Sequence, residues 1–546
     1  MYLVLARDRD AVSITELGDD GSPTGAVSRL SRAELPAEVA RRERERPRWV
    51  WDDTERWYPA LLDAGVRVER CVDLRLSHAI LRNSQLSAES QLASTGRSEW
   101  DALEPVSTDD GGLFSLNTRT DPDPLTEFQL QRAATTDSRL TLLLAAECAG
   151  ALAAAEMRHR GLPWREDVHN TLLTELLGPR PPAGDRPAKL AVLAELIREA
   201  LGAPKLNPDS PVELLKALRR AGLQVNSTAK WELYDKKHPV IAPLLEYKSL
   251  ARLLTANGWH WLETNVSGGR FRADYVVGGV VTGRWASKGG GGAMQLPKSV
   301  RSAVVADPGW KLVVADASQL EPRILAAMSG DEAMANAGRA KDMYGAIVAS
   351  GAVATRDHAK VAMLGAMYGA TTGDSGRLMP ALTRAFPRAI GLVEAAARAG
   401  ESGEVVSTWL GRSSPRPGAA WFDAQSRAST EGATDADTTR ARQTAKSWGR
   451  FTRNFIVQGT AAEWAMSWIA LTRAGLFELA GWRDDSPHLA FFLHDELVIH
   501  TPAEHADAAT RVVSDAAARS GALLFRNLSV EFPLSIAVVD RYSDAK

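Results

Sequence analysis

Two hydrophobic segments of the chain end at acidic residues. Residues 312–315 are apolar and lead directly into Asp316, a pattern typical of a short buried strand with a carboxylate at its end. Much later, residues 489–493 and 497–499 form two further apolar runs on either side of the acidic segment 494–496. This pattern predicts two strands joined by a tight turn. Each acid would therefore lie at the edge of a sheet.

A segment between these acids has a helical repeat with an unusual face. Arg356, Lys360, Leu364 and Tyr368 follow one another at intervals of four residues, so they share one side of a helix. Two cations, an apolar side chain and an aromatic ring rarely form a core stripe. They suit a nucleoside triphosphate, with the cations on the phosphates and the other two groups beneath the base. A solvated cationic helix face is the plainer alternative.

Asp316 and Asp495 are the candidate metal ligands. Hard divalent cations such as Mg²⁺ bind carboxylate oxygens, and two ions about 3.5–4 Å apart need bridging carboxylates. An isolated Asp after an apolar run more often forms a turn or caps a helix. The cationic helix face between the two acids favours a two-metal site for phosphoryl transfer.

The remaining periodicity predicts a mixed α/β chain. Residues 2–5 and 11–15 have the pattern of short strands, whereas residues 190–201 and 212–221 repeat their apolar positions with helical spacing. A glycine ends each of these two helical segments, as is common at helix C-termini.

Length and charge limit the possible organisation. A chain of 546 residues exceeds one hydrophobic core and should form two or more domains. Its 65 basic and 67 acidic residues nearly balance, so any nucleic-acid surface must be a local patch. Residues 440–453 contain five cations and no acid and lead into Asn454 and Gln458, although such a run is often only a solvated face. The cations are Arg440, Arg442, Lys446, Arg450 and Arg453.

Two cysteines and one apolar stretch bear on the cellular compartment. Cys71 and Cys148 belong to no paired motif, so neither a disulfide framework nor a zinc site is expected. Residues 140–157 are the most apolar stretch, but Glu147 and Glu156 interrupt it, which favours an Ala-rich soluble helix over a membrane span. The N-terminus lacks a long apolar segment. We expect a cytoplasmic protein, with the bacterial nucleoid included, and no membrane partner.

Several motifs together resemble the family A DNA polymerases of the bacterial DNA polymerase I type. Residues 316–323 are similar to the first palm motif, residues 356–369 to the fingers helix and residues 494–496 to the second palm motif, all in the family's order. Thr282-Gly283-Arg284 with Gln295 resembles the primer-template segment. The resemblance covers the chain from about residue 206 to its C-terminus.

The resemblance implies a fold and domain boundaries. Residues 1–165 would form an RNase H-like α/β domain of the exonuclease type, and residues 166–546 a right-hand polymerase domain. Within the latter, the thumb would span about residues 185–270, and the palm and fingers about residues 271–546.

The resemblance also implies roles for the acids and cations. Asp316 and Asp495 would hold two Mg²⁺ or Mn²⁺ ions, supported by Glu496. Arg356 and Lys360 would grip the phosphates of the incoming deoxynucleotide.

The rest of the nucleotide and DNA site follows from the same resemblance. Tyr368 would pack near the nascent base pair, Glu321 would exclude a 2′ hydroxyl, and Gln319 would contact the nucleotide. Leu364 stands where the family usually has Phe or Tyr, and Ala317 replaces the usual aromatic after the first Asp, so rate and fidelity are unpredictable by analogy. The residues expected to contact primer-template DNA are Arg284, Gln295, Arg450, Asn454, Gln458 and His494.

The N-terminal segment resembles a proofreading exonuclease but lacks a full set of acids. An active site of that type needs four carboxylates for two metals. Asp53-Thr54-Glu55 has the spacing of the early acidic pair, but its neighbours match the middle motif better. Asp137 lacks the Tyr expected four residues before it. We expect a degenerate exonuclease fold that serves as a structural platform, and no separate 5′ nuclease, since few residues precede it.

The leading functional prediction is template-directed DNA synthesis by a monomer, from primer-template DNA and dNTPs, in repair or gap filling. Three alternatives remain open. They are a bifunctional 3′-5′ exonuclease and polymerase, a nuclease, and a DNA-binding scaffold with little catalysis.

Overall fold

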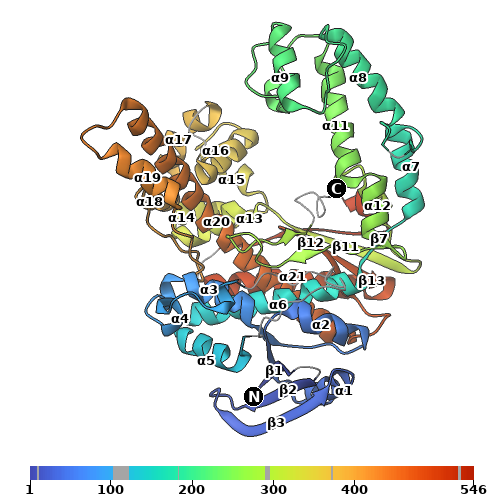
Figure 1. Ribbon diagram of the computed structural model, residues 1–546, viewed down its shortest axis with the longest axis vertical. Coiled ribbons are helices and arrows are strands. Elements are labelled where there is room, and N and C mark those ends of the chain that lie inside the picture. Colours follow the sequence, from blue (N-terminus) through green and yellow to red (C-terminus); the bar gives the residue numbers. More distant parts are fainter. Residues whose placement is uncertain are drawn as a thin grey trace. The chain divides into compact units, whose positions relative to one another are not determined.

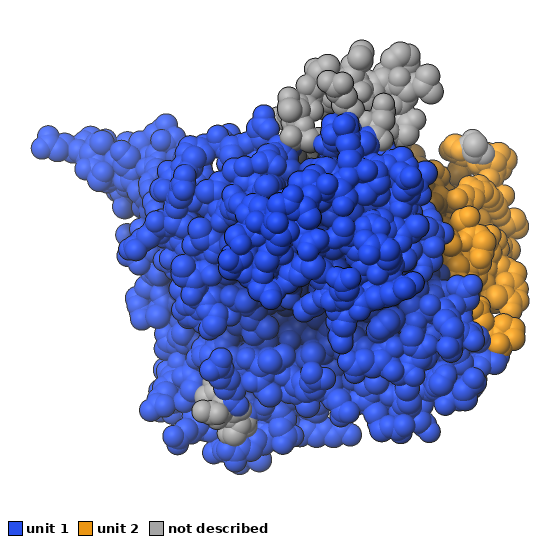
Figure 2. All heavy atoms as spheres, turned by 90° about the horizontal axis from the view of Figure 1, so that it is seen from below, with its two compact units in different colours: residues 1–160, 275–288, 309–538 blue, residues 161–274, 289–308, 539–546 orange. Residues whose placement is uncertain are grey.

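The computed structural model describes residues 1–8, 11–102, 122–182, 184–288, 296–369, 373–526 and 530–545 (Figure 1). Contacts divide the chain into two compact units, coloured separately in Figure 2. Unit 1 comprises Met1–Arg160, Tyr275–Lys288 and Gly309–Val538. Unit 2 comprises Gly161–Asp274, Gly289–Pro308 and Val539–Lys546.

Unit 1 begins with a five-stranded sheet in the order β3-β2-β1-β4-β5. β1 (Tyr2–Asp8), β2 (Ala11–Leu17) and β3 (Pro23–Ser31) pair antiparallel, and β4 (Arg48–Trp51) and β5 (Cys71–Asp73) continue the sheet in parallel. Three antiparallel strands followed by two parallel ones form the RNase H-like arrangement expected from the sequence. The strands predicted from residues 2–5 and 11–15 are confirmed.

Helices cover this sheet and bury its aromatic residues. Trp49 and Trp51 of β4 are fully buried and pack with Leu3, Leu5 and Leu152 in one cluster. Because Leu152 comes from a long helix outside the sheet, that helix completes the core. The helices are α1 (Leu35–Arg42), α2 (Thr54–Asp63), α3 (Leu74–Asn83), α4 (Gln91–Ser94), α5 (Pro124–Ala134) and α6 (Ser138–Arg160).

By length and composition alone, an 18-residue window of helix α6 is apolar enough to cross a membrane. Of the residues in that window, 72% are buried inside the folded chain. Its two acids are also buried and paired, since Glu147 binds Arg412 and Glu156 binds Arg473. These contacts are those of a core helix, because a buried carboxylate needs a partner of opposite charge.

A second sheet lies in unit 1 in the order β12-β13-β11-β14. β11 (Trp310–Ala317) pairs antiparallel with β13 (Glu496–Pro502), which also pairs with β12 (His488–Leu493). β14 (Leu534–Val539) is the edge strand beside β11. Both strand predictions around the acidic residues are therefore confirmed. The middle strands are buried on both faces, with Val313, Val498 and their neighbours inaccessible to solvent.

Helices flank this second sheet, and the longest of them is α20, with 46 residues. A capping box starts α20, in which Thr434 and Asp437 exchange side-chain and backbone hydrogen bonds. Its second half buries the indole rings of Trp464 and Trp468. The helices are α13 (Leu320–Ser329), α14 (Glu332–Gly338), α15 (Met343–Ala349), α16 (Arg356–Tyr368), α17 (Gly373–Ala385), α18 (Pro387–Glu401), α19 (Ala419–Ala428), α20 (Asp435–Ala480) and α21 (Ala506–Phe525).

Unit 2 is mostly helical. Residues Trp164, His169, Trp261 and Phe271 form an aromatic cluster with ring centroids 5.1–5.9 Å apart. The two predicted helices of residues 190–201 and 212–221 are present as α8 and α9. The elements are α7 (Glu166–Leu177), α8 (Ala188–Ala200), α9 (Pro211–Arg220), α10 (Lys230–Leu233), α11 (Ile241–Asn257), α12 (Trp259–Asn265), β6 (Leu162–Pro163), β7 (Val266–Ser267) and β8 (Arg270–Phe271).

Glu463 is a fully buried acid in the middle of α20. Its carboxylate accepts the Thr408 hydroxyl and the Leu410 backbone N–H, the latter at 3.0 Å. Burial raises the pKa of Glu463 to about 7, because an apolar environment disfavours the charged form.

We predict that Glu463→Gln removes part of the pH dependence of stability. Between the usual pKa near 4.5 and the folded pKa near 7, unfolding releases a proton, so the free energy of unfolding falls as pH rises. This pKa shift corresponds to a decrease in the free energy of unfolding on the order of 3 kcal/mol as the pH rises through that range. Gln resembles the protonated acid and has no such slope. Urea denaturation at pH 5 and pH 8, followed by tryptophan fluorescence, gives the free energy of unfolding of both proteins. If this free energy changed equally with pH in the wild type and in Glu463→Gln, the raised pKa of Glu463 would be contradicted.

Candidate active site

Three acids converge at one end of the second sheet. Asp316 is the second-to-last residue of β11, and it is paired with Glu496 of β13. The N–H of Ala317 donates to the carbonyl oxygen of Asp495 at 2.8 Å. This short antiparallel pairing therefore brings together residues about 180 positions apart in the sequence.

Two strained backbone positions flank these acids. His494 links β12 to Asp495 with φ 57°, and Gln319, at the start of α13, also has φ 57°. The left-handed region is uncommon for non-glycine residues and is often found at functional sites. Among the described residues, only Arg46 and Arg526 are further non-glycine residues with positive φ.

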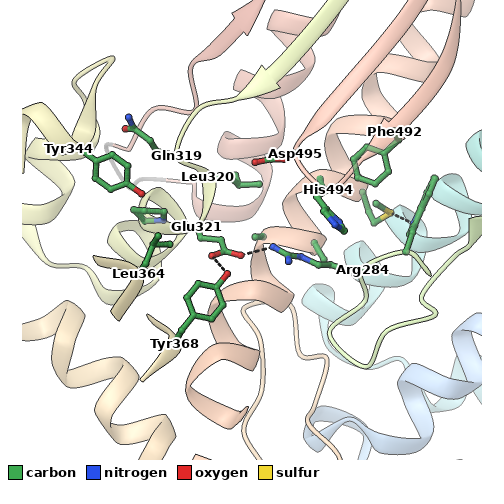
Figure 3. A pocket seen from close by; sticks show the side chains of 16 residues that line it. Arg284, Gln319, Leu320, Glu321, Tyr344, Leu364, Tyr368, Phe492, His494 and Asp495 are labelled. Atoms are coloured by element: carbon green, nitrogen blue, oxygen red, sulfur yellow. Dashed lines mark hydrogen bonds and ion pairs between the residues drawn. The ribbon is translucent and has the colours of Figure 1, made fainter. Parts of the chain in front are cut away.

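A pocket of about 260 Å³ opens beside the acids (Figure 3). Its walls come from α13, α15, α16, the middle of α20 and the β12–β13 turn. A loop between β9 (Tyr275–Val276) and β10 (Ala286–Ser287) supplies the remaining wall. The sequence-predicted residues that line the pocket are Arg284, Gln319, Glu321, Leu364, Tyr368, His494 and Asp495.

Glu321 is held from two sides inside the pocket. Nη2 of Arg284 lies 2.5 Å from one carboxylate oxygen, and the hydroxyl of Tyr368 donates to the other at 2.7 Å (Figure 3). Burial, followed by the charge of Glu321, raises the pKa of Tyr368 above its usual value. Partial desolvation and the nearby Arg284 lower the pKa of His494. The carboxylate of Glu321 thus has a defined position.

Helix α16 presents the four residues predicted to share one face. Its buried side consists of small and apolar residues such as Ala362 and Met363, and the Thr355 hydroxyl caps its N-terminus. On the opposite side Arg356 and Lys360 are exposed, whereas Tyr368 is 40% exposed and lines the pocket with Leu364. The predicted helix is confirmed, with its cations at the N-terminal end and its apolar groups toward the pocket.

Arg356 has a partner that the sequence pattern did not reveal. Its Nε lies 2.9 Å from Asp342, and the other carboxylate oxygen of Asp342 accepts from Gln319 at 2.8 Å. The Arg356 guanidinium also lies 5.6 Å from the ring centroid of Tyr344, which lines the pocket. The hydrogen bond from Arg356 lowers the pKa of Asp342.

Helix α20 leads toward the pocket along one face. Arg450, Asn454 and Gln458 follow at four-residue spacing, and Ala461 and Ala462 then line the pocket. Arg450 is exposed, and the other two polar residues are partly buried.

One of the five cations of residues 440–453 faces the protein interior and not the surface. Arg453 is buried, donates to the Ala366 carbonyl oxygen at 2.9 Å and pairs with Glu394. Arg453 follows Arg450 by three residues and not four, so its side chain leaves the face shared by Arg450 and Asn454 and points toward α16 and α18. Gln295 lies outside the described residues, as does the glycine tract 289–292.

Several pocket residues had no signal in the sequence pattern. They are apolar or aromatic residues that resemble ordinary core positions until the fold brings them together. They include Trp285, Leu320, Pro322, Tyr344, Ala465, Met466 and Phe492.

The acids at the sheet end fit a magnesium-type site. Mg²⁺ commonly takes one or two protein carboxylates and completes its shell with water and substrate phosphates. Asp316 and Asp495 supply two such carboxylates next to an open pocket. In the part of the chain that the structure describes, no group of three or more His, Cys, Asp or Glu residues could hold a metal by itself.

Comparisons with known proteins point to one family. The family model of DNA polymerase family A matches residues 187–544. DNA polymerase I of Chloroflexus aurantiacus is 26% identical over 395 residues, which cover 64% of this chain and 38% of that protein. The thermostable DNA polymerase I of Thermus filiformis is 26% identical over 327 residues, covering 54% and 36%. The chain thus spans less than two fifths of these relatives.

A solved structure has the same fold. The polymerase domain of Pol1 from M. smegmatis, in complex with DNA primer-template and dNTP, superposes with a TM-score of 0.69 at 17% identity. The superposition covers 100% of this chain and 95% of that chain. The resemblance drawn from the motifs is confirmed, and the chain belongs to DNA polymerase family A.

Proposed function

We propose that this chain is a template-directed DNA polymerase that adds deoxynucleotides to a primer 3′ end. The observation that carries the proposal is the pocket in which Asp495, Glu321 and Arg284 meet beside the strand end of Asp316. The related Pol1 domain was solved with primer-template DNA and dNTP, which supports the same ligands here.

Asp316 and Asp495 would hold two Mg²⁺ or Mn²⁺ ions, with Glu496 beside them on β13. Bound there, the ions would lower the pKa of the primer 3′ hydroxyl and neutralise the triphosphate. The strand pairing keeps both carboxylates at the same end of the sheet before substrate arrives, so little reorganisation is needed.

The exposed end of α16 suits the triphosphate. Arg356 and Lys360 lie on the first two turns, where the helix dipole adds to their positive charge. Gln319 is placed beside Arg356 through Asp342. A phosphate would replace the carboxylate of Asp342 as the partner of Arg356.

The pocket floor suits a deoxyribose and a base. Glu321, held by Arg284 and Tyr368, would occupy the space that a 2′ hydroxyl needs. Leu364 and Tyr368 supply an apolar surface for the nascent base pair. Arg284, His494 and the α20 face of Arg450, Asn454 and Gln458 would contact the primer-template.

Residues 1–165 would form a degenerate exonuclease-like domain, and residues 166–546 the polymerase domain. The acids of the N-terminal sheet are engaged with protein groups: Asp52 pairs with Arg56, and Asp53 with Arg75. Asp73 caps α3 and accepts the Thr54 N–H. Because these acids are engaged, we propose a polymerase without proofreading. We also propose that it acts as a cytoplasmic monomer in repair or gap filling.

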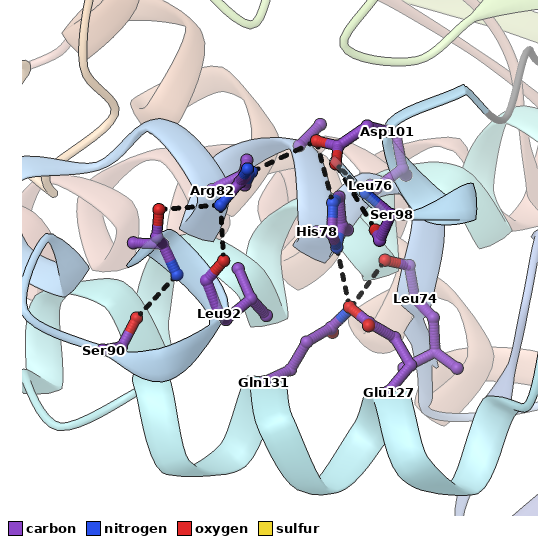
Figure 4. A network of polar contacts seen from close by, with 12 residues as sticks. Leu74, Leu76, His78, Arg82, Ser90, Leu92, Ser98, Asp101, Glu127 and Gln131 are labelled. Carbon is purple, nitrogen blue, oxygen red and sulfur yellow. Dashed lines mark hydrogen bonds and ion pairs between the residues drawn. The ribbon is translucent and has the colours of Figure 1, made fainter. Parts of the chain in front are cut away.

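A partly buried polar network beside α3 also engages two acids, Glu127 and Asp101 (Figure 4). His78 lies 2.8 Å from Glu127 and 3.3 Å from Asp101. Arg82 contacts Asp101, and Gln131 donates to Glu127. These contacts support a structural role for this domain.

Replacement of either metal-ligand candidate should abolish synthesis. We expect Asp316→Asn and Asp495→Asn to lower primer extension by at least about 10²–10⁴-fold, since each removes charge stabilisation worth several kcal/mol. Extension of a 5′-labelled primer with four dNTPs measures this loss, and gel-shift titration should show retained DNA binding. Asp507→Asn, on the exposed first turn of α21, is the control. Undiminished extension by Asp495→Asn would disprove the site assignment.

Glu321 should determine the choice of sugar. Glu321→Ala opens the space at the 2′ position, so the ratio of kcat/KM for dATP to that for ATP should fall by about 10- to 100-fold. Glu321→Gln keeps the size of the side chain and an acceptor oxygen, and should retain most of the discrimination. Equal ratios for Glu321→Ala and the wild type would mean that another residue selects the sugar.

We predict that the protein has no proofreading activity. With Mg²⁺ or Mn²⁺ and no dNTPs, the labelled primer should keep its full length, because the candidate acids Asp53 and Asp137 are bound by arginines. A paired and a mismatched 3′ end should behave alike. Shortening of the primer that persists in Asp495→Asn and disappears in Asp53→Asn would establish an N-terminal exonuclease instead.

A further inference from the structure

The loop between β9 and β10 holds two pocket residues, Arg284 and Trp285. The strands that anchor this loop are only two residues long each, with Ala286 paired to Val276 and Ser287 to Tyr275. Two such pairs do not hold a nine-residue loop rigidly. Its position must therefore depend on the elements that pack against it, of which α6, α20 and the Arg412 segment lie in the same unit 1.

Helix α6 packs against the Trp285 end of the loop. The indole N–H of Trp285 donates to Sδ of Met466 at 3.1 Å. Gly150 of α6 faces this pair, because a Cβ there would lie 2.9 Å from Met466 Sδ and 3.5 Å from Trp285 Cζ2. The absence of a side chain at 150 thus allows the helix to approach a pocket residue closely.

One turn earlier on α6, Glu147 supports the rest of the loop. Its carboxylate forms an ion pair with Arg412, and both side chains are buried, Glu147 at 1% and Arg412 at 9% exposure. The Arg412 guanidinium lies against Gly283, where a Cβ would be 2.7 Å from Nε. Gly283 has φ +86°, so this close approach occurs at a backbone conformation that favours glycine.

The Arg412 segment is itself fixed to α20. Thr408 N–H donates to the Arg412 carbonyl oxygen at 2.8 Å, and the Thr408 hydroxyl donates to Glu463. Gly459 of α20 packs against Thr408 and against the Thr282 carbonyl oxygen, 3.3 Å from where its Cβ would be. Arg412 is thereby a rigid support for Gly283, the residue directly before Arg284.

We infer that Glu147 is a positioning residue for sugar selection, which rests on the proposed polymerase function. By neutralising Arg412, Glu147 keeps the guanidinium against Gly283, and Gly283 in turn sets Arg284 at its ion-pair distance from Glu321. Without the carboxylate, a buried guanidinium is left unpaired and moves toward water or another acceptor. The loop then relaxes, and Glu321 loses one of its two supports.

The test compares Glu147→Gln with a matched control on the same helix. Glu156→Gln removes another buried carboxylate of α6, which binds Arg473 at 2.6 Å and Tyr58 at 2.6 Å, away from the loop. The readout is the ratio of kcat/KM for dATP to that for ATP, since a ratio does not depend on the fraction of folded enzyme. We expect about a tenfold lower ratio in Glu147→Gln, typical of coupled residues in one network, and an unchanged ratio in Glu156→Gln.

A double variant shows whether Glu147 acts through Arg284. Glu147→Gln should have little further effect in an Arg284→Ala background, whereas independent effects would multiply. Multiplied effects, or a wild-type ratio in Glu147→Gln, would overturn the inference. If Glu147→Gln does not fold, Arg412→Lys keeps the positive charge but loses the guanidinium at Gly283 and should lower the ratio similarly; an unchanged ratio would overturn the inference.

A measurement without catalysis separates this inference from the proposed function. Deuterium uptake of a peptide covering residues 277–288 should rise in Glu147→Gln and stay at the wild-type level in Glu156→Gln. Equal uptake in all three proteins would overturn the support role of Glu147. A wild-type protein that extends no primer, with this uptake difference present, would instead overturn the proposed function and leave the contact chain standing.

Discussion

The register of β11 against β13 is the constraint on which the site depends. It places Asp316 opposite Glu496 and the backbone of Ala317 on Asp495. Because side chains alternate between the two faces of a strand, a slip of one residue would turn Asp316 to the opposite face. Both strands are buried, so such a slip would also disrupt the packing of their side chains on either face of the sheet. Hydrophobic packing thereby determines the position of the acids.

Buried ion pairs connect the N-terminal helices to the rest of unit 1. Glu147 and Glu156 of α6 bind arginines that lie more than 250 residues later. Pairing a buried charge rarely adds much stability, but loss of one partner is strongly destabilising, so these contacts favour one docking geometry over others. Through Gly150, helix α6 also lies against the pocket residues Met466 and Trp285.

Two arginines of the candidate site, Arg284 and Arg356, are paired with protein acids. Arg284 binds Glu321 in a partly buried pair, and Arg356 binds Asp342 on the surface. A surface pair contributes little and is easily exchanged, which suits a residue that must receive a phosphate. The more buried pair of Arg284 and Glu321 exchanges less easily with water or ligand, which suits residues that form the wall of the pocket. The two pairs thus differ in the way that their proposed roles require.

The sequence alone determined the acid-bearing strands, the α16 helix with its four-residue repeat, and the family. These follow from local periodicity and from motifs in which neighbouring residues share one task. Tertiary structure decided the inward turn of Arg453, the Asp342 partner of Arg356 and the support of the Arg284 loop by Glu147. Each is a contact between separate elements of the fold, and neither helical phase nor an apolar run specifies the partner that a side chain meets.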